Sequence, residues 1–154
     1  MPTVVIRMTK PSGETVALME ILRALPDNAW TWTILELWAV GIPPEGMTMP
    51  SFEDLISSSE SGYSMTWPEL LDLAARLDQV MDCLIVATER PHPAPRRLAD
   101  QDDAPELLVR IDALDSTEWH ITTNARLRTL AHPCVHACCM LKCLHGDHTD
   151  QGCP

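Results

Sequence analysis

The sequence is short of glycine and of positive charge. Only 6 of its 154 residues are glycines, and they are scattered along the chain. We therefore do not expect a glycine-rich loop that cradles phosphate groups, and neither the dinucleotide-binding motif nor the P-loop motif occurs. Lysine and arginine total 11 against 22 aspartates and glutamates, which gives a formal net charge of −11. Because nucleic acids are held largely through their phosphates by positive side chains, this balance argues against nucleic-acid binding.

Long hydrophobic runs and targeting segments are also missing. No stretch approaches the roughly 18 apolar residues that a membrane-spanning helix needs. Residues 1–14 hold too short an apolar run for a secretory signal. We therefore expect a cytoplasmic protein that does not enter a membrane. Hydrophobic residues make up 45% of the chain, which is enough for the core of one globular domain.

Motifs of known catalytic sites are absent as well. Neither the nucleophile elbow G-x-S-x-G nor the zinc-protease motif H-E-x-x-H is found. His92, His120 and His132 have no placed partner that would turn them into a site. The acidic run at residues 100–103 lacks the glycine and the distal glutamate of a calcium loop. These absences predict a protein that is not an enzyme.

The clearest strand is predicted over residues 29–40, where aromatic and β-branched side chains dominate. Both of its faces are largely apolar, which indicates an inner strand. Strict alternation would place Glu36 on one face with three tryptophans and Ile34. A carboxylate buried there would mark a functional site. The alternative is a solvated Glu36, or one paired with an arginine such as Arg7 or Arg110.

The best helix signal is the sequence TWPE, in which Thr66 and Glu69 can form a capping box. The apolar spacing after it predicts a helix over residues 66–80 packed on the sheet. Other short helices are expected at 16–25, at 51–56 with Ser51 as cap, and at 124–130 with Asn124 as cap. Strands are expected at 3–8, 83–88, 107–114 and 116–123, the last two forming a hairpin around Asp115-Ser116, and residues 89–105 read as a surface loop.

This order of elements predicts a small single α+β domain over residues 1–131. The sheet is expected to be mixed or antiparallel, with helices on one face. A Cys/His-rich tail over residues 132–154 follows, expected to be disordered or a short helix. Five tryptophans exceed tyrosine and phenylalanine together. Core packing explains most of them, and one or two are candidates for exposed anchors of a protein interface.

The tail holds five of the six cysteines and three of the six histidines. Thiolate and imidazole ligands suit Zn(II) and Cu(I), so the tail is a candidate metal site. Its spacing matches no standard zinc finger. The candidate ligands are Cys134, His136, Cys138, Cys139, Cys143, His145, His148 and Cys153.

Two other interpretations of the tail stay open. A folded leader followed by a short Cys-dense segment resembles the layout of ribosomally made, post-translationally modified peptide precursors. That resemblance covers the layout alone, and it implies a tail whose cysteines are modified. The tail can also be an extension without a selected role, as chain ends are commonly disordered.

The acidic surface supplies the hypothesis for function. Carboxylates concentrate at residues 69–82 and 100–106, where they could dock a basic protein partner. The layout looks like small immunity or inhibitor proteins, which implies a non-enzymatic domain that binds and neutralises another protein. The alternative is metal or thiol handling by the tail. The candidate partner-binding residues are Glu69, Asp72, Asp78, Asp82, Asp100, Asp102 and Asp103.

Overall fold

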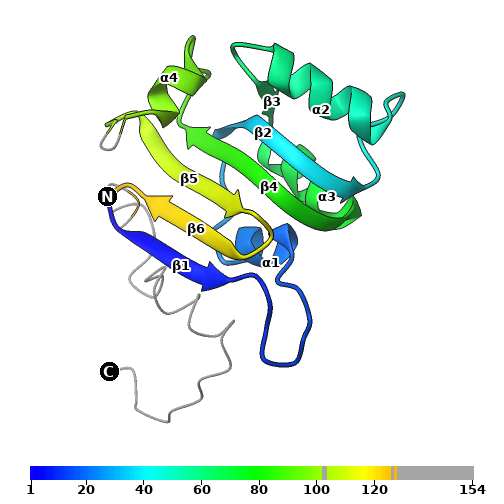
Figure 1. Ribbon diagram of the computed structural model, residues 1–154. Coiled ribbons are helices and arrows are strands. Elements are labelled where there is room, and N and C mark those ends of the chain that lie inside the picture. The colour runs from blue at the N-terminus through cyan, green and yellow to red at the C-terminus, as the bar shows by residue number, and fades with distance from the viewer. Residues whose placement is uncertain (102–103, 126, 128–154) are drawn as a thin grey trace, which may run out of the picture.

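The fold is built on one antiparallel sheet. The computed structural model describes residues 1–101, 104–125 and 127. They form a six-stranded sheet in the order β1-β6-β5-β4-β2-β3, with every neighbouring pair antiparallel (Figure 1). The strands are β1 (Thr3–Arg7), β2 (Thr31–Gly41), β3 (Tyr63–Met65), β4 (Leu77–Thr88), β5 (Leu107–Leu114) and β6 (Glu118–Thr123); the helices are α1 (Leu18–Arg23), α2 (Met49–Ser58), α3 (Trp67–Arg76) and α4 (Pro95–Ala99). The predicted α+β class is confirmed, and the sheet is antiparallel rather than mixed.

Helices α1 and α3 cover one face of the sheet, which we call the helical face (Figure 1). The main core lies between them and the strands. Trp32 of β2, Ile85 of β4 and Leu73 of α3 are fully buried in it. Strand β2 lies between β4 and β3, so the prediction of an inner strand at residues 29–40 is confirmed. The predicted hairpin is also confirmed: the Thr117 N–H donates to the Leu114 carbonyl, and Asp115 and Ser116, the central residues of this turn, both have a positive φ.

Helix α3 is shorter than its apolar spacing predicts. Its start agrees with the sequence, because the Glu69 carboxylate accepts a 2.7 Å hydrogen bond from the Thr66 N–H. The helix ends at Arg76, and Leu77 begins β4 without an intervening loop. The prediction that the helix continues to Val80 was wrong, because Val80 pairs with Ala39 of β2. Pairing with the long strand β2 outweighs the helical spacing of these leucines and valines.

Helix α2 begins earlier than predicted. Thr48 is its N-cap and accepts a hydrogen bond from the Ser51 N–H, while the Ser51 hydroxyl accepts one from the Thr48 N–H. Ser51 is therefore the third residue of the first turn rather than the cap. Pro50 fits this first turn, where a missing N–H costs little. Beside the helix, the Glu53 carboxylate accepts from the Ala39 N–H, at a part of β2 that β3 does not reach.

The segment predicted as a surface loop at residues 89–105 contains helix α4 and a small second core. Leu98 and Ala99 are buried against Leu35 and Val86 on the face of the sheet opposite to α1 and α3. Arg96 fixes α4 to the end of α2 by donating to the carbonyls of Ile56 and Ser59. The expectation that helices cover only one face was therefore wrong. Helix α4 could not be predicted from the sequence because it has only five residues and lies among prolines.

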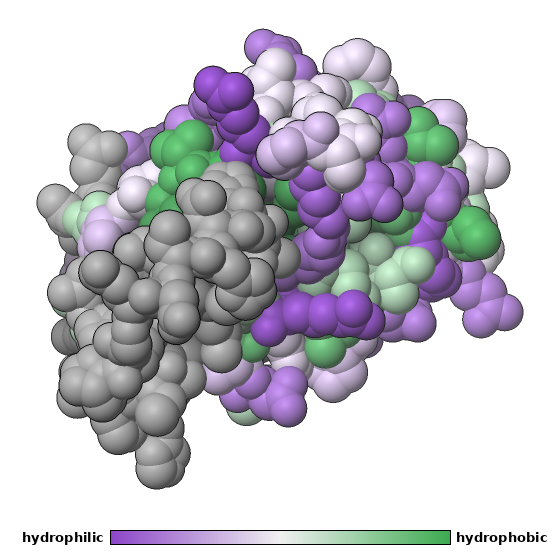
Figure 2. Space-filling view, turned by 90° about the horizontal axis from the view of Figure 1, so that it is seen from below, coloured by the Kyte–Doolittle hydropathy of each residue, from purple (hydrophilic) through white to green (hydrophobic). Residues whose placement is uncertain are grey.

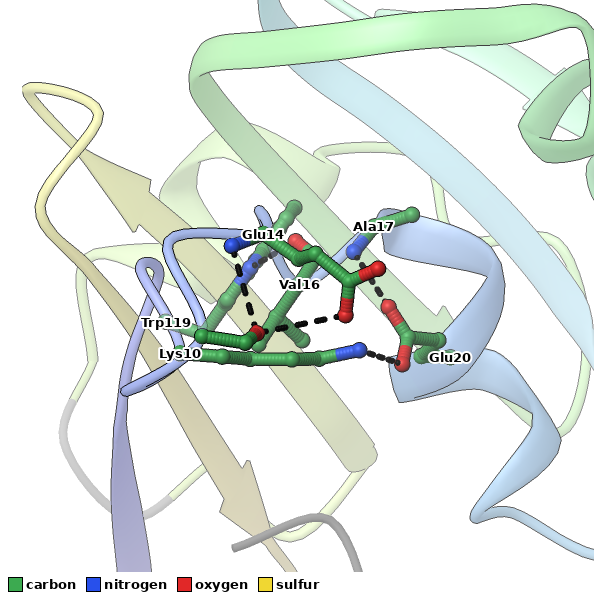
Figure 3. A network of polar contacts seen from close by, with 7 residues as sticks. Lys10, Glu14, Val16, Ala17, Glu20 and Trp119 are labelled. Carbon is green, nitrogen blue, oxygen red and sulfur yellow. Dashed lines mark hydrogen bonds and ion pairs between the residues drawn. The ribbon is translucent and has the colours of Figure 1, made fainter.

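A polar network fastens the loop after β1 to helix α1 (Figure 3). The Lys10 ammonium lies 2.7 Å from one oxygen of Glu20, and the Ala17 N–H donates to the other at 2.9 Å. The Trp119 indole N–H donates to the Val16 carbonyl. Burial raises the pKa of Glu20, but the hydrogen bonds from Lys10 and Ala17 outweigh it and leave that pKa below its ordinary value.

Glu20→Gln is expected to destabilise the protein at neutral pH and not in acid. A carboxylate whose pKa is lowered by folding stabilises the native state above its ordinary pKa of 4.5, and this stabilisation is lost as pH falls through the lower pKa of the folded state. The pair is partly exposed, so we expect a loss below about 1 kcal/mol at pH about 7. Urea unfolding at pH about 7 and about 2 measures it. Glu14→Gln serves as the control, and a cost that is equal at both pH values would contradict the assignment.

The domain is expected to fold without the tail, whose predicted structure and metal ligands lie outside the described residues. A chain that ends at His132 retains all six strands and both cores. Its free energy of unfolding should differ from that of the full chain by less than about 0.5 kcal/mol, as for changes at a surface. Circular dichroism during urea titration measures this. Loss of a cooperative transition would show that the tail is part of the core.

Candidate protein-binding surface

The face of the sheet opposite to the helical face is only partly covered. Residues of β4 alternate between the two faces, so Ile85 points into the main core and Leu84 and Val86 point away from it. Helix α4 covers Val86, but among the described residues no helix covers the sheet beyond it. We call this remaining area the open face. Cross-strand pairing assigns to it Val5, Arg7, Glu36, Trp38, Val40, Asp82, Leu84, Arg110, Asp112, Leu114, Glu118 and His120.

A β-bulge in β2 decides which side chains reach the open face. Ile34 pairs with Ile85 and Glu36 pairs with Leu84, so Leu35 is an extra residue without a partner. Ile34 therefore faces the main core, while Glu36 lies exposed on the opposite side. The prediction that Glu36 lies on one face with Trp32 and Ile34 was wrong for this reason. The tryptophan of β2 that shares a face with Glu36 is Trp38.

The centre of the open face is polar and internally paired. Arg110 makes two 2.8 Å hydrogen bonds to the two oxygens of Asp112, and it donates to the Ala99 carbonyl of α4. On the neighbouring strand, the His120 ring lies 3.1 Å from the Glu118 carboxylate. A shallow hollow of about 470 Å³ lies here, lined in part by Arg110, Asp112 and His120. These polar groups are hydrogen-bonded to one another, so the region is suited to contact with a polar surface rather than to capture of a single ion.

One corner of the open face is apolar and acidic. Trp38 is 58% exposed, Val40 52% and Leu114 45%, although each lies on a strand of the sheet. Trp38 pairs with Asp82 across the strands, and Glu36 lies two residues before Trp38 on the same face. We call this group, Glu36, Trp38, Val40, Asp82 and Leu114, the Trp38 corner. A large exposed aromatic on a sheet face is typical of a protein interface.

Other parts of the described surface mix hydrophobic and hydrophilic residues (Figure 2). On the underside of the molecule, hydrophobic residues form separate groups among hydrophilic ones where atoms are not grey (Figure 2). No group of three or more His, Cys, Asp or Glu side chains within the described ranges is arranged to hold a metal ion. Within the same ranges, no helix is long and apolar enough to cross a membrane.

The acidic residues predicted to bind a partner do not form one surface. Glu69 and Asp72 belong to α3 and are used locally, the first in the helix cap and the second in an ion pair with Arg76. Asp100 ends α4, which lies on the opposite face of the sheet from α3. Asp78 is exposed near the start of β4, and Asp82 lies on the open face. Asp102, Asp103 and the candidate metal ligands of the tail lie outside the described residues.

Sequence reasoning missed most of the open face. It singled out Asp82 and Glu36, and it allowed for one or two exposed tryptophans without saying which. In the sequence, Trp38, Val40 and Leu114 look like ordinary buried residues of apolar strands. Their exposure becomes clear only from the bulge in β2 and from the part of the sheet that α4 leaves uncovered.

Comparisons with protein-family models, with curated proteins and with solved structures give no match for this chain.

Proposed function

We propose that the chain is a non-enzymatic, acidic protein-binding domain that contacts its partner through the open face. The exposure of Trp38 on a strand carries this proposal. The solvated face of an antiparallel sheet normally carries polar side chains rather than a tryptophan, and tryptophan is enriched among residues that dominate binding energy at protein interfaces. The small acidic layout makes an inhibitor or immunity-type role in the cytoplasm the form of this function that we favour.

The surroundings of Trp38 support the proposal. Val40, two residues along β2, adds apolar area next to Trp38, Leu114 adds more on β5 beyond Asp82, and the paired polar side chains of Arg110, Asp112, Glu118 and His120 supply a polar border on one side. Protein interfaces commonly combine apolar area with neighbouring polar groups. Because the groups of this border already pair with one another, docking would not leave them as buried unpaired charges.

Site-specific photocrosslinking tests the proposal. A photoreactive phenylalanine replaces Leu114 on the open face in one variant and exposed Ala75 on α3 in a matched variant. Both are irradiated in an extract of the source cells. We expect a discrete covalent product at position 114 and none at position 75. The same product at both positions, or a product at position 75 alone, would contradict the proposal.

The tail supports a second candidate function, metal or thiol handling, because its cysteines and histidines are dense. A third is a precursor whose tail is modified. To test metal handling, the zinc content of the full chain is compared with that of a chain ending at His132, isolated in parallel. Mass spectrometry of the tail isolated from source cells tests whether the chain is a precursor with a modified tail.

A further inference from the structure

We infer that the Trp38 corner takes lysine or arginine side chains from a positively charged protein segment. The inference rests on the proposed function, since it names the chemistry of the partner at the open face. Trp38 would supply an aromatic surface for the cation, and the carboxylates of Glu36 and Asp82 would accept its N–H groups.

The geometry of neighbouring strands brings these groups together. Trp38 and Asp82 are directly paired across β2 and β4, which places their Cβ atoms about 4.5–5.5 Å apart. Glu36 and Trp38 are two residues apart on one strand, a separation of roughly 6.5–7 Å. One ammonium or guanidinium group above the indole can therefore reach both carboxylates.

The two carboxylates have capacity left for a ligand. In the described part of the chain, neither Glu36 nor Asp82 forms an ion pair with a cationic side chain. One oxygen of Asp82 accepts the Asp115 N–H at 2.9 Å, and an ionised carboxylate can accept further hydrogen bonds on its two oxygens. The nearby cation Arg110 is held by Asp112 and by the Ala99 carbonyl.

The apolar members of the corner select the kind of cation. A lysine or arginine carries its charge on an aliphatic stem, which can pack on Val40 or on Leu114 while the charge lies over the ring of Trp38. Such cation–π contacts are strongest with tryptophan. The net charge of −11 would also raise the rate of encounter with a basic partner. A second copy of this chain is disfavoured, because pairing two such corners would bring like charges together.

A matched pair of double variants tests the inference. Glu36→Gln with Asp82→Asn removes two charges from the corner, and Asp54→Asn with Glu60→Gln removes two exposed charges elsewhere. The probe is a labelled nine-residue peptide of alternating lysine and leucine, and a glutamate-leucine peptide is the negative probe. Fluorescence anisotropy gives the dissociation constants, and the indole N–H signal of Trp38 in a ¹H–¹⁵N spectrum reports contact.

We expect the corner double variant and Trp38→Ala each to weaken binding of the basic peptide about tenfold or more, a typical effect of an interface anchor. The Asp54/Glu60 variant should bind within about twofold of the wild type, a difference of about 0.4 kcal/mol. Equal weakening by both double variants would mean that net charge alone attracts the peptide, and would overturn the inference. Dimerisation that depends on Trp38, seen by sedimentation, would overturn it in favour of a second copy.

The same variants separate this inference from the proposed function. Each double variant is combined with the photoreactive residue at position 114. If the product forms when Glu36 and Asp82 are intact and is lost with Glu36→Gln/Asp82→Asn, both proposals are supported. If it persists in that variant, the open face binds a partner but the assigned chemistry is wrong. If no product forms with any variant, the proposed function itself fails.

Discussion

Trp32→Ala is expected to lower the free energy of unfolding by about 3–5 kcal/mol, the usual cost of removing a large buried aromatic. Trp32 is fully buried, and its ring lies between those of Trp30 and Trp67, at centroid distances of 6.1 and 5.4 Å. Its indole N–H donates to the Asn28 side chain at 3.0 Å. The substitution leaves a cavity in the main core and removes this hydrogen bond, and both effects are destabilising.

Urea denaturation followed by circular dichroism measures this cost, with Trp38→Ala as the matched control. Trp38 lies on the same strand but is 58% exposed, so its loss should cost less than about 1 kcal/mol. The stability of a small domain is about 5–15 kcal/mol, so the Trp32 variant should unfold at much lower urea. Equal costs for the two tryptophans would mean that both side chains lie on the same face of β2, as they would in a strand without the bulge at Leu35.

Gly41→Ala is expected to cost about 2–5 kcal/mol, from backbone strain and overpacking together. Gly41 has φ of +152°, which side chains rarely allow. A Cβ atom at this position would lie 2.4 Å from the Arg76 carbonyl oxygen and 2.7 Å from the Leu77 Cα. Both neighbours are backbone atoms at the junction of α3 and β4, so they cannot move aside as a flexible side chain could.

Gly46→Ala is the control for this substitution. Gly46 also has a positive φ, +83°, but no heavy atom beyond its two chain neighbours lies within 4 Å of the position that its Cβ would take. It should therefore show the conformational cost alone, of order 1 kcal/mol. Thermal and urea unfolding measure the stability of both variants, and the difference between them gives the cost of the contact between the new Cβ at position 41 and the backbone of Arg76 and Leu77. A Gly41 variant no less stable than the Gly46 variant would show that the junction can move.

Local signals in the sequence were sufficient for several elements. The TWPE box gave the start of α3, and the residues around Asp115-Ser116 gave the hairpin, because caps and tight turns depend on a few neighbouring residues. The end of α3 could not be obtained in this way. Leu73, Leu77 and Val80 fit a helical stripe, and only the distant residues Ala39 and Gly41 decide that the last two belong to a strand.

The candidate site was predictable only in outline. The excess of carboxylates indicated a basic partner, but sequence does not show which carboxylates the protein uses for itself. Glu69 caps a helix and Asp72 pairs with Arg76, while Glu36 and Asp82 share a face with Trp38. That last grouping depends on one extra residue, Leu35, whose insertion into the β2 ladder exchanges the faces for the rest of the strand.

The pairing of β1 with β6 has a consequence for synthesis of the chain. Thr3 and Thr122 are hydrogen-bonded although 119 positions separate them, and the Thr123 N–H donates to the Pro2 carbonyl. Among the described strands β1 leaves the ribosome first, and nearly the whole domain must be synthesised before its partner β6 emerges. During translation β1 is an unpaired, β-prone segment, and closure of the sheet is a late, non-local step that slows folding. Nascent chains should become resistant to protease only once β6 has cleared the exit tunnel.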